Sequence, residues 1–121
     1  MINVLCILMA YARDRLIILI ICFKLFKKHS SIKLPFRATS LRTLLDYIES
    51  IGPNVYIGKN ALIGLNPRAN FKIGAGTWIN ENLEISCNNS VEIGMNVVIS
   101  RGVFIGDAIH PYEDIKNPIS V

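Results

Sequence analysis

The chain contains few of the residues from which most reactive sites are built. Its 121 residues include two histidines, His29 and His110, and three cysteines, Cys6, Cys22 and Cys87. No two of these residues show the spacing of zinc ligands, so the sequence predicts no metal site. Three cysteines without paired spacing are typical of small apolar residues in a reducing compartment. His29 stands beside a lysine pair, which predicts a surface position.

Three other kinds of segment are missing. There is neither a G-x-G-x-x-G sequence nor a Walker loop, and there is no serine nucleophile elbow. The apolar run from Leu16 to Phe23, which is bounded by charges on both sides, has eight residues, whereas a membrane-spanning helix needs about 20. No positively charged segment precedes the apolar stretch, as it would in a signal peptide. The sequence therefore predicts neither a nucleotide cradle nor a spanning segment.

The excess of basic over acidic residues lies in the first part of the chain. Residues 1–50 carry eight Lys and Arg against three acids, and residues 51–121 carry five against six. This distribution argues against a nucleic-acid groove in the second part. Residues 1–28 leave two interpretations open. One is a helix packed on the rest of the protein or on another subunit. The other is an interfacial helix whose Lys24, Lys27 and Lys28 meet anionic headgroups in a peripheral membrane contact.

What the chain has instead is a six-residue repeat over residues 51–110. Nine hexads, each opening with Ile, form three blocks of eighteen residues, separated by residues 69–72 and by residues 91–92. A period of six fits neither a helix nor a half-buried strand. Hexapeptide repeats are typical of a parallel β-helix. The predicted fold is therefore an all-β solenoid of about three coils, preceded by an N-terminal helical arm.

The repeat predicts the environment of each hexad position. The opening Ile points inward and stacks on its equivalents, and each buried Ile contributes roughly 1.5–3 kcal/mol. Glycine at the second position permits backbone angles that a side chain would forbid, and Asn and Gly suit the corners. The fifth position also faces inward and is mostly small or β-branched. It is occupied by Val55, Ala61, Pro67, Thr77, Leu83, Asn89, Val97, Val103 and Ile109.

The chain divides into three parts. Residues 1–50 form the apolar arm and a cover for the first coil, residues 51–110 form the repeats, and residues 111–121 form a loop that projects from them. Pro35 excludes a helix in the connector of residues 29–38, which can begin the first strand. Ser40 is placed to cap a short helix over residues 40–49. No further coil follows residue 121, so we expect this chain to be the N-terminal part of a larger protein.

The stretch IGDAIHPYEDIKNPIS carries the most specific pattern. It places His110, Tyr112, Glu113, Asp114 and Pro118 where the last hexad gives way to the tail. Together with the hexads, it resembles the active-site region of the left-handed β-helix acyltransferases. The resemblance covers roughly residues 45–121 and is closest to the sugar and surface-polysaccharide O-acetyltransferases. It implies a left-handed parallel β-helix and an acetyl-CoA-dependent enzyme of the cytoplasm, at the inner face of the cytoplasmic membrane.

The resemblance also implies a role for particular residues. His110 is the expected catalytic base, which takes a proton from a sugar hydroxyl as that oxygen attacks the thioester of acetyl-CoA. Asn80, and after it Asn82, is the candidate for binding the acceptor sugar, although both also suit corner positions. Trp78 either stacks on a sugar face or packs on the wall. The family works as homotrimers with active sites between subunits, and it uses no metal or nucleic acid.

Two departures from the family leave a second hypothesis open. Ala108 stands where many polysaccharide enzymes have a second histidine, and the coils that line the acetyl-CoA groove would follow residue 121. These two departures leave open whether the chain taken by itself is active. The alternative is a non-catalytic β-helix used for assembly or membrane docking. A γ-type carbonic anhydrase is disfavoured, because it needs three histidine ligands and only His110 lies in the repeats.

Overall fold

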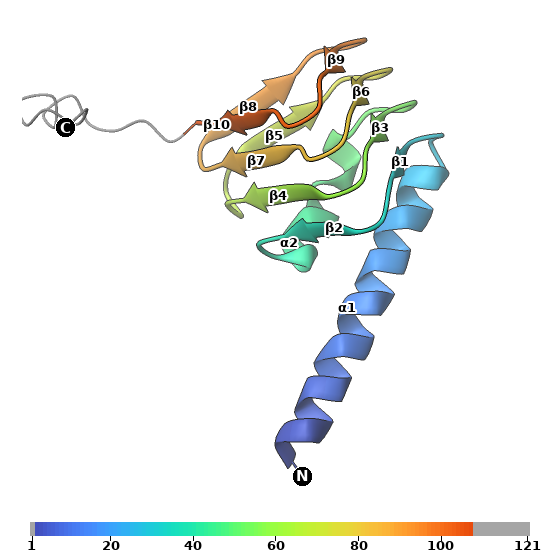
Figure 1. Ribbon diagram of the computed structural model, residues 1–121, viewed down its shortest axis with the longest axis vertical. Coiled ribbons are helices and arrows are strands. Elements are labelled where there is room, and N and C mark those ends of the chain that lie inside the picture. The colour runs from blue at the N-terminus through green and yellow to red at the C-terminus, as the bar shows by residue number, and fades with distance from the viewer. Residues whose placement is uncertain (1, 108–121) are drawn as a thin grey trace, which may run out of the picture.

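The computed structural model describes residues 2–107, with side chains from residue 4 onward. Its helices are α1 (Ile2–Phe26), α2 (Leu41–Asp46) and the 3₁₀ turn η1 (Ile48–Ser50). The strands are short, and all of their pairings are parallel (Figure 1). They are β1 (Ser31–Ile32), β2 (Phe36–Ala38), β3 (Tyr56–Ile57), β4 (Ala61–Leu65), β5 (Asn70–Ile73), β6 (Trp78–Ile79), β7 (Glu84–Cys87), β8 (Ser90–Ile93), β9 (Val98–Ile99) and β10 (Phe104–Gly106).

The predicted class, an all-β solenoid built as a left-handed parallel β-helix of about three coils, is wrong. The structure is mixed α/β, with an N-terminal helix and parallel sheets of short strands. The sheets run in the orders β1-β3-β6-β9, β10-β7-β4-β2 and β5-β8. The helix belongs to the fold because Ile21 and Leu25 of α1 are buried in the same core cluster as the strand residues. The fold class is therefore decided by apolar residues of α1, which lie outside the six-residue repeat.

Each block of three hexads contributes its strands to the sheets in the same sequence. Tyr56 of β3 pairs with Trp78 of β6, and Trp78 pairs with Val98 of β9. Leu62 of β4 pairs with Glu84 of β7, which pairs with Phe104 of β10. The strand-to-strand spacing in sequence is thus the block of eighteen residues plus the residues that separate the blocks. Segments far apart in the chain lie side by side, as Figure 1 shows.

The prediction that the opening isoleucines face inward is confirmed. Ile51, Ile57, Ile63, Ile73, Ile79, Ile85, Ile93 and Ile99 are all buried, and Ile105 is partly buried. At the fifth position the prediction is wrong for Pro67 and Asn89, which are exposed. Both belong to the third hexad of a block, where the chain turns away after a longer strand. The residues that separate the blocks were not expected to be strands, yet they form most of β5 and half of β8, and they bury Phe71 and Val91.

The second-position glycines do not adopt the unusual backbone angles predicted for them, and at Gly52, Gly58 and Gly74 they serve close packing. None of them has a positive φ, whereas a Cβ on Gly74 would lie 2.5 Å from the carbonyl carbon of Gly94. On Gly58 it would lie 2.8 Å from the carbonyl carbon of Asn80. The left-handed conformation falls two residues later, at the fourth position of the first two hexads of each block. It is adopted there by Asn54, Asn60, Gly76, Asn82, Asn96 and Gly102.

The connector and the cover behave as the sequence suggests. Residues 31–38 enter the sheets, because β1 pairs with β3 and β2 pairs with β4. The short helix is confirmed as α2: the Ser40 side chain accepts a hydrogen bond from the backbone N–H of Thr43 at 3.2 Å, and Leu44 is buried. Tyr47 then packs edge-on against Phe71, and its hydroxyl donates to the Asn66 carbonyl at 3.0 Å. This segment closes the apolar end of the sheets.

Helix α1 ends in a defined cap before the first strand. His29 adopts φ of 61°, and the N–H groups of His29 and Ser30 donate to the carbonyls of Phe26 and Leu25. These are the two bonds of a Schellman motif. The predicted surface position of His29 is confirmed, since it is exposed. The buried Ser30 hydroxyl joins the cap to the sheets by donating to the Gly52 carbonyl at 2.7 Å.

Candidate functional site

An aromatic pair, of which one ring is exposed and the other partly buried, stands on the outer face of the sheet β1-β3-β6-β9. The rings of Tyr56 and Trp78 are stacked, with centroids 4.1 Å apart and planes inclined by 21°. The two residues are direct cross-strand partners, so the register of the sheet brings the rings together. Trp78 remains 50% exposed, and the equally outward-facing Val98 continues the column. The result is a flat, partly wetted apolar surface of the kind on which a sugar ring can stack.

Asn80 borders this surface. Its side-chain oxygen accepts a 3.4 Å hydrogen bond from the Trp78 indole N–H, and its amide nitrogen donates to the Ile99 carbonyl at 2.9 Å. Asn80 thus holds the indole at one end and ties the chain after β6 to that after β9. The structure brings together two of the predicted site residues, Trp78 and Asn80, and it shows that both polar ends of the Asn80 amide are already engaged.

Asn82 lies at the next corner. It is exposed and has φ of 63°, a conformation that Asn tolerates better than most residues. Its backbone N–H donates to the carbonyl of Lys59, the residue next to the corresponding corner at Asn60. This geometry gives Asn82 a turn-forming role, and among residues 2–107 the indole N–H of Trp78 bonds to Asn80 and not to Asn82.

The predicted catalytic base, His110, lies outside the described residues, as do Glu113 and Asp114. The last described residue, Asp107, has a clear function. Its carboxylate accepts hydrogen bonds from the backbone N–H groups of Asn88, Asn89 and Ser90 at 2.7, 2.6 and 2.6 Å. These bonds, that from Asn88 foremost, hold the pKa of Asp107 below its ordinary value. Asp107 therefore fixes the end of β10 to the corner between β7 and β8, three residues before His110.

The surroundings of Cys22 and Cys87 do not favour nucleophilic chemistry at either thiol. Burial raises the pKa of the Cys22 thiol, and burial together with the nearby Asp107 charge raises that of Cys87. A raised pKa keeps a thiol protonated at neutral pH. Cys6 is exposed on α1, so it is the most accessible of the three cysteines to a labelling reagent.

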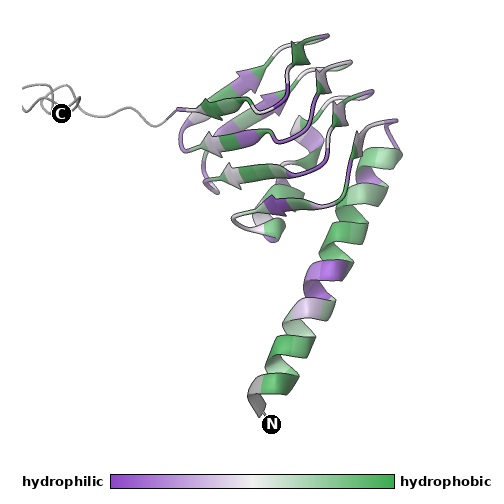
Figure 2. Ribbon diagram, in the orientation of Figure 1, coloured by the Kyte–Doolittle hydropathy of each residue, from purple (hydrophilic) through white to green (hydrophobic). Residues whose placement is uncertain are grey.

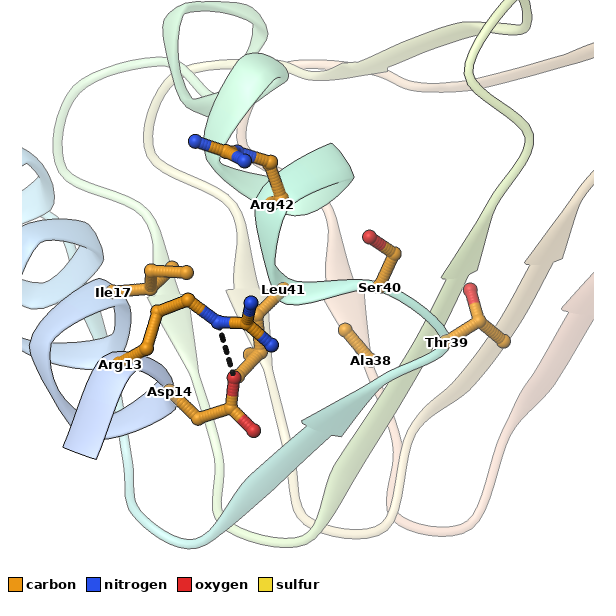
Figure 3. Close-up of a pocket in the computed structure, with 8 residues that line it drawn as sticks. All are labelled: Arg13, Asp14, Ile17, Ala38, Thr39, Ser40, Leu41 and Arg42. Carbon is orange, nitrogen blue, oxygen red and sulfur yellow. Dashed lines mark ion pairs between the residues drawn. The ribbon is translucent and has the colours of Figure 1, made fainter. Parts of the chain in front are cut away.

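A polar cleft lies where α1 leaves the body (Figure 3). Arg13 and Asp14 of α1 face Thr39, Ser40 and Arg42 across it. The Arg13 guanidinium pairs with the Asp14 carboxylate at 3.9 Å, and the Ser40 hydroxyl is used to cap α2. The cleft thus presents positive charge but no nucleophile paired with a base. Among residues 2–107 no cluster of three His, Cys, Asp or Glu side chains could hold a metal ion.

Sequence reasoning missed Tyr56, although a signal for it was present. Tyr56, Trp78 and Val98 all occupy the sixth position of the first hexad of their block. Aligning the blocks with each other, and not only the hexads, would have placed these three side chains in one column. The comparisons with known proteins add nothing to this site, because no family model, curated protein or solved structure matches the chain. The resemblance to acyltransferases therefore depends on the hexads and the tail alone.

Proposed function

We propose that this protein transfers an acetyl group from acetyl-CoA to a hydroxyl of a sugar or surface polysaccharide. The observation that carries the proposal is the stack of the half-exposed Trp78 on the partly buried Tyr56, with Asn80 at its edge. A half-exposed tryptophan contributes little to the core but offers a large rigid face to a ligand. Sugar rings present C–H faces that pack on such surfaces while their hydroxyls bond to neighbouring polar groups.

The chemistry is assigned from the sequence of the tail. His110 accepts the proton of the acceptor hydroxyl while the oxygen attacks the thioester carbonyl, and the C–S bond then breaks to release CoA as its thiol. A positioned base of this kind typically raises the reaction rate by about 10²–10⁴-fold. An unperturbed histidine titrates near neutral pH, which suits it to this step without special tuning. Supply of acetyl-CoA favours the cytoplasm, at the inner face of the cytoplasmic membrane.

The aromatic surface and the anchor of the tail belong to different sheets. Trp78 lies in β6 of the sheet β1-β3-β6-β9, whereas Asp107 follows β10 of the sheet β10-β7-β4-β2. A site that uses both Trp78 and His110 is therefore well served by two copies of the chain, one supplying the aromatic surface and the other the base. This favours a homo-oligomer, with a trimer as the form that the resemblance implies.

Tryptophan fluorescence gives a direct test, because Trp78 is the one tryptophan in the sequence. A panel of sugars and bacterial oligosaccharides is titrated into the protein while the emission of Trp78 is followed. Transfer is measured separately with radiolabelled acetyl-CoA. We expect a saturable emission change for at least one acceptor, and labelled ester with the same acceptor.

Matched variants separate binding from chemistry. His110→Ala should abolish transfer and leave the emission change intact, whereas Tyr56→Ala should weaken acceptor binding about tenfold or more. Full transfer by His110→Ala would exclude histidine as the base. An acceptor panel that changes neither emission nor product would favour a non-catalytic role in assembly.

A further inference from the structure

Helix α1 has two apolar faces, and the sheets cover one of them. Ile21 and Leu25 are fully buried, with Ile17 and Ile18 partly buried beside them. On the opposite side, apolar residues recur at alternating steps of four and three. We name these seven exposed positions the outer stripe: Leu5, Met9, Ala12, Leu16, Leu19, Phe23 and Phe26. Its six large side chains are each 58–75% exposed. A second apolar face along the whole helix needs a partner that the described chain does not supply.

The body extends the outer stripe. Leu19 lines a cleft together with Leu34 and Pro35 of the β1–β2 connection. It also lines a second cleft, with Phe23 and Phe26 on one side and residues 30–32 on the other. Leu34 itself is 59% exposed. The apolar surface therefore runs from α1 onto the first strands, which makes it broader than a single helix face.

The N-terminal end of α1 is apolar on all sides. Val4, Leu5, Ile7, Leu8 and Met9 are each more than half exposed and together point in every direction around the axis. In Figure 1 this end projects beyond the sheets, and in Figure 2 it is green up to a purple band. Residues 4–12 span about 13 Å at 1.5 Å per residue. A neighbouring helix would cover one side of such a segment, whereas hydrocarbon surrounds it completely.

Charge around the outer stripe distinguishes between partners. Residues 13–28 hold five basic side chains, of which Lys28 donates to the Ile48 carbonyl of the body, and one acid, Asp14, which is paired with Arg13. Arg15 lies 4.9 Å from the Tyr11 ring centroid, and Lys27 lies 5.8 Å from that of Phe23. Long basic side chains next to aromatic rings at the edge of an apolar stripe are suited to a bilayer surface. Identical helices packed together would instead bring like charges close to one another.

We propose that α1 docks this protein on an anionic lipid bilayer through the outer stripe. The stripe and Leu34 lie at the boundary between headgroups and acyl chains, and the apolar end of residues 4–12 enters further. Arg13, Arg15 and Lys27 contact lipid phosphates, and Arg42 lines the same cleft as Arg13 (Figure 3). Insertion is partial, because 13 Å is about half of a hydrocarbon core of roughly 30 Å. None of the helices described in residues 2–107 has the length and hydropathy needed to cross a bilayer.

Sedimentation with vesicles tests the proposal. The full chain is mixed with vesicles of phosphatidylcholine alone or with 30% phosphatidylglycerol (about one third, to model an anionic surface). We expect binding to the anionic vesicles and at least tenfold weaker binding to the neutral ones, with a further loss in high salt. Leu19→Glu should lower binding to anionic vesicles about tenfold or more. Met95→Glu is the matched control, since Met95 is 68% exposed against 66% for Leu19 but lies in the turn between β8 and β9, away from α1.

Cys6 allows the depth of insertion to be measured separately. A solvent-sensitive dye is placed on this exposed cysteine in a Cys22→Ala background, where Cys87 is buried. Its emission should shift to the blue with anionic vesicles. The same dye on a cysteine introduced as Ser100→Cys, with Cys6→Ala, should not shift, because Ser100 is exposed at the far end of the sheets.

Three results would overturn the proposal. The first is equal binding of the parent chain and Leu19→Glu to anionic vesicles. The second is the absence of vesicle binding together with an unshifted dye at Cys6. The third is an oligomer that Leu19→Glu dissociates while lipid binding is unchanged, which would assign the stripe to a second copy of the chain. None of these outcomes depends on acetyl transfer, so they leave the proposed function to its own test.

Discussion

Helix α1 and the sheets use the same aliphatic residues in opposite ways. Along β4, β7 and β8 buried and more exposed residues alternate, and in Figure 2 the colour changes with this alternation along β7 and β8. In α1 the apolar residues lie on all sides, and many of the largest are exposed. In the sheets, therefore, position in the hexad predicts burial. In the helix only the packing partner decides which side chains are buried, and the sequence does not identify that partner.

The largest expected effect comes from removing one aromatic ring from the sheets and, for comparison, one from α1. Phe71→Ala removes a ring that is 1% exposed and packs against Tyr47, and Phe23→Ala removes one that is 62% exposed. Phe71→Ala should lower the free energy of unfolding by about 3–5 kcal/mol, from lost transfer energy and the cavity left behind. Phe23→Ala should change it by less than about 0.5 kcal/mol. Urea unfolding followed by circular dichroism measures both.

Equal losses for the two variants would break the comparison. They would mean that Phe23 is covered in solution, for example by another copy of the chain. The experiment is repeated at two protein concentrations, because a contribution from association would depend on concentration.

The next effect concerns the contact between successive blocks. Gly74→Ala places a methyl group within 2.6 Å of Gly94 and Met95 backbone atoms, so the two strands' ends must separate. Overpacking of this kind costs typically 1–3 kcal/mol. The matched control is Gly94→Ala, whose methyl group would find its nearest neighbour, a Val97 side-chain carbon, at 3.7 Å. Thermal unfolding should show a clear loss for Gly74→Ala and little change for Gly94→Ala. A tolerant Gly74 would contradict the close-packing role given to the second hexad position.

A third test replaces a buried hydroxyl in the core. Thr77 is 1% exposed, donates to the Gly94 carbonyl at 2.7 Å and accepts from the Val97 N–H at 3.3 Å. Thr77→Val keeps the shape and leaves both backbone groups without this partner, which should cost about 1–3 kcal/mol. Thr77→Ser keeps the hydroxyl and should lose less. A lower denaturant midpoint for Thr77→Val than for Thr77→Ser would support the role of the hydroxyl group. The reverse order would show that only the methyl group matters.

The sequence predicts the inner columns well and the class poorly, for a physical reason. An Ile that recurs at the same place in each hexad predicts which side of the strand faces the core. The opening isoleucines from Ile51 to Ile99 are buried in agreement with that prediction. The alternation in Asn70–Ile73 and Ser90–Ile93 could also have been read as strands, but it fell between the hexads. Helix α1 gives no comparable signal, because Ile21 and Phe23 are equally apolar and only Ile21 meets the core. At the candidate site, Trp78 and Asn80 follow from the sequence, whereas Tyr56 required the alignment of whole blocks.

The smallest effect is expected at the edge of the sheets, where Asp107 joins β10 to the preceding corner. Hydrogen bonds from Asn88, Asn89 and Ser90 lower its folded-state pKa, so the carboxylate stabilises the fold above its ordinary pKa of about 4. That contribution should disappear as the pH falls through the lowered folded value. Asp107→Asn keeps the shape but not the charge. Its melting temperature should lie below that of the parent protein at pH 7, and the difference should narrow as the pH falls below about 4. A difference that stays constant over this range would show that the shape of the side chain, and not its ionisation, holds the end of the sheets.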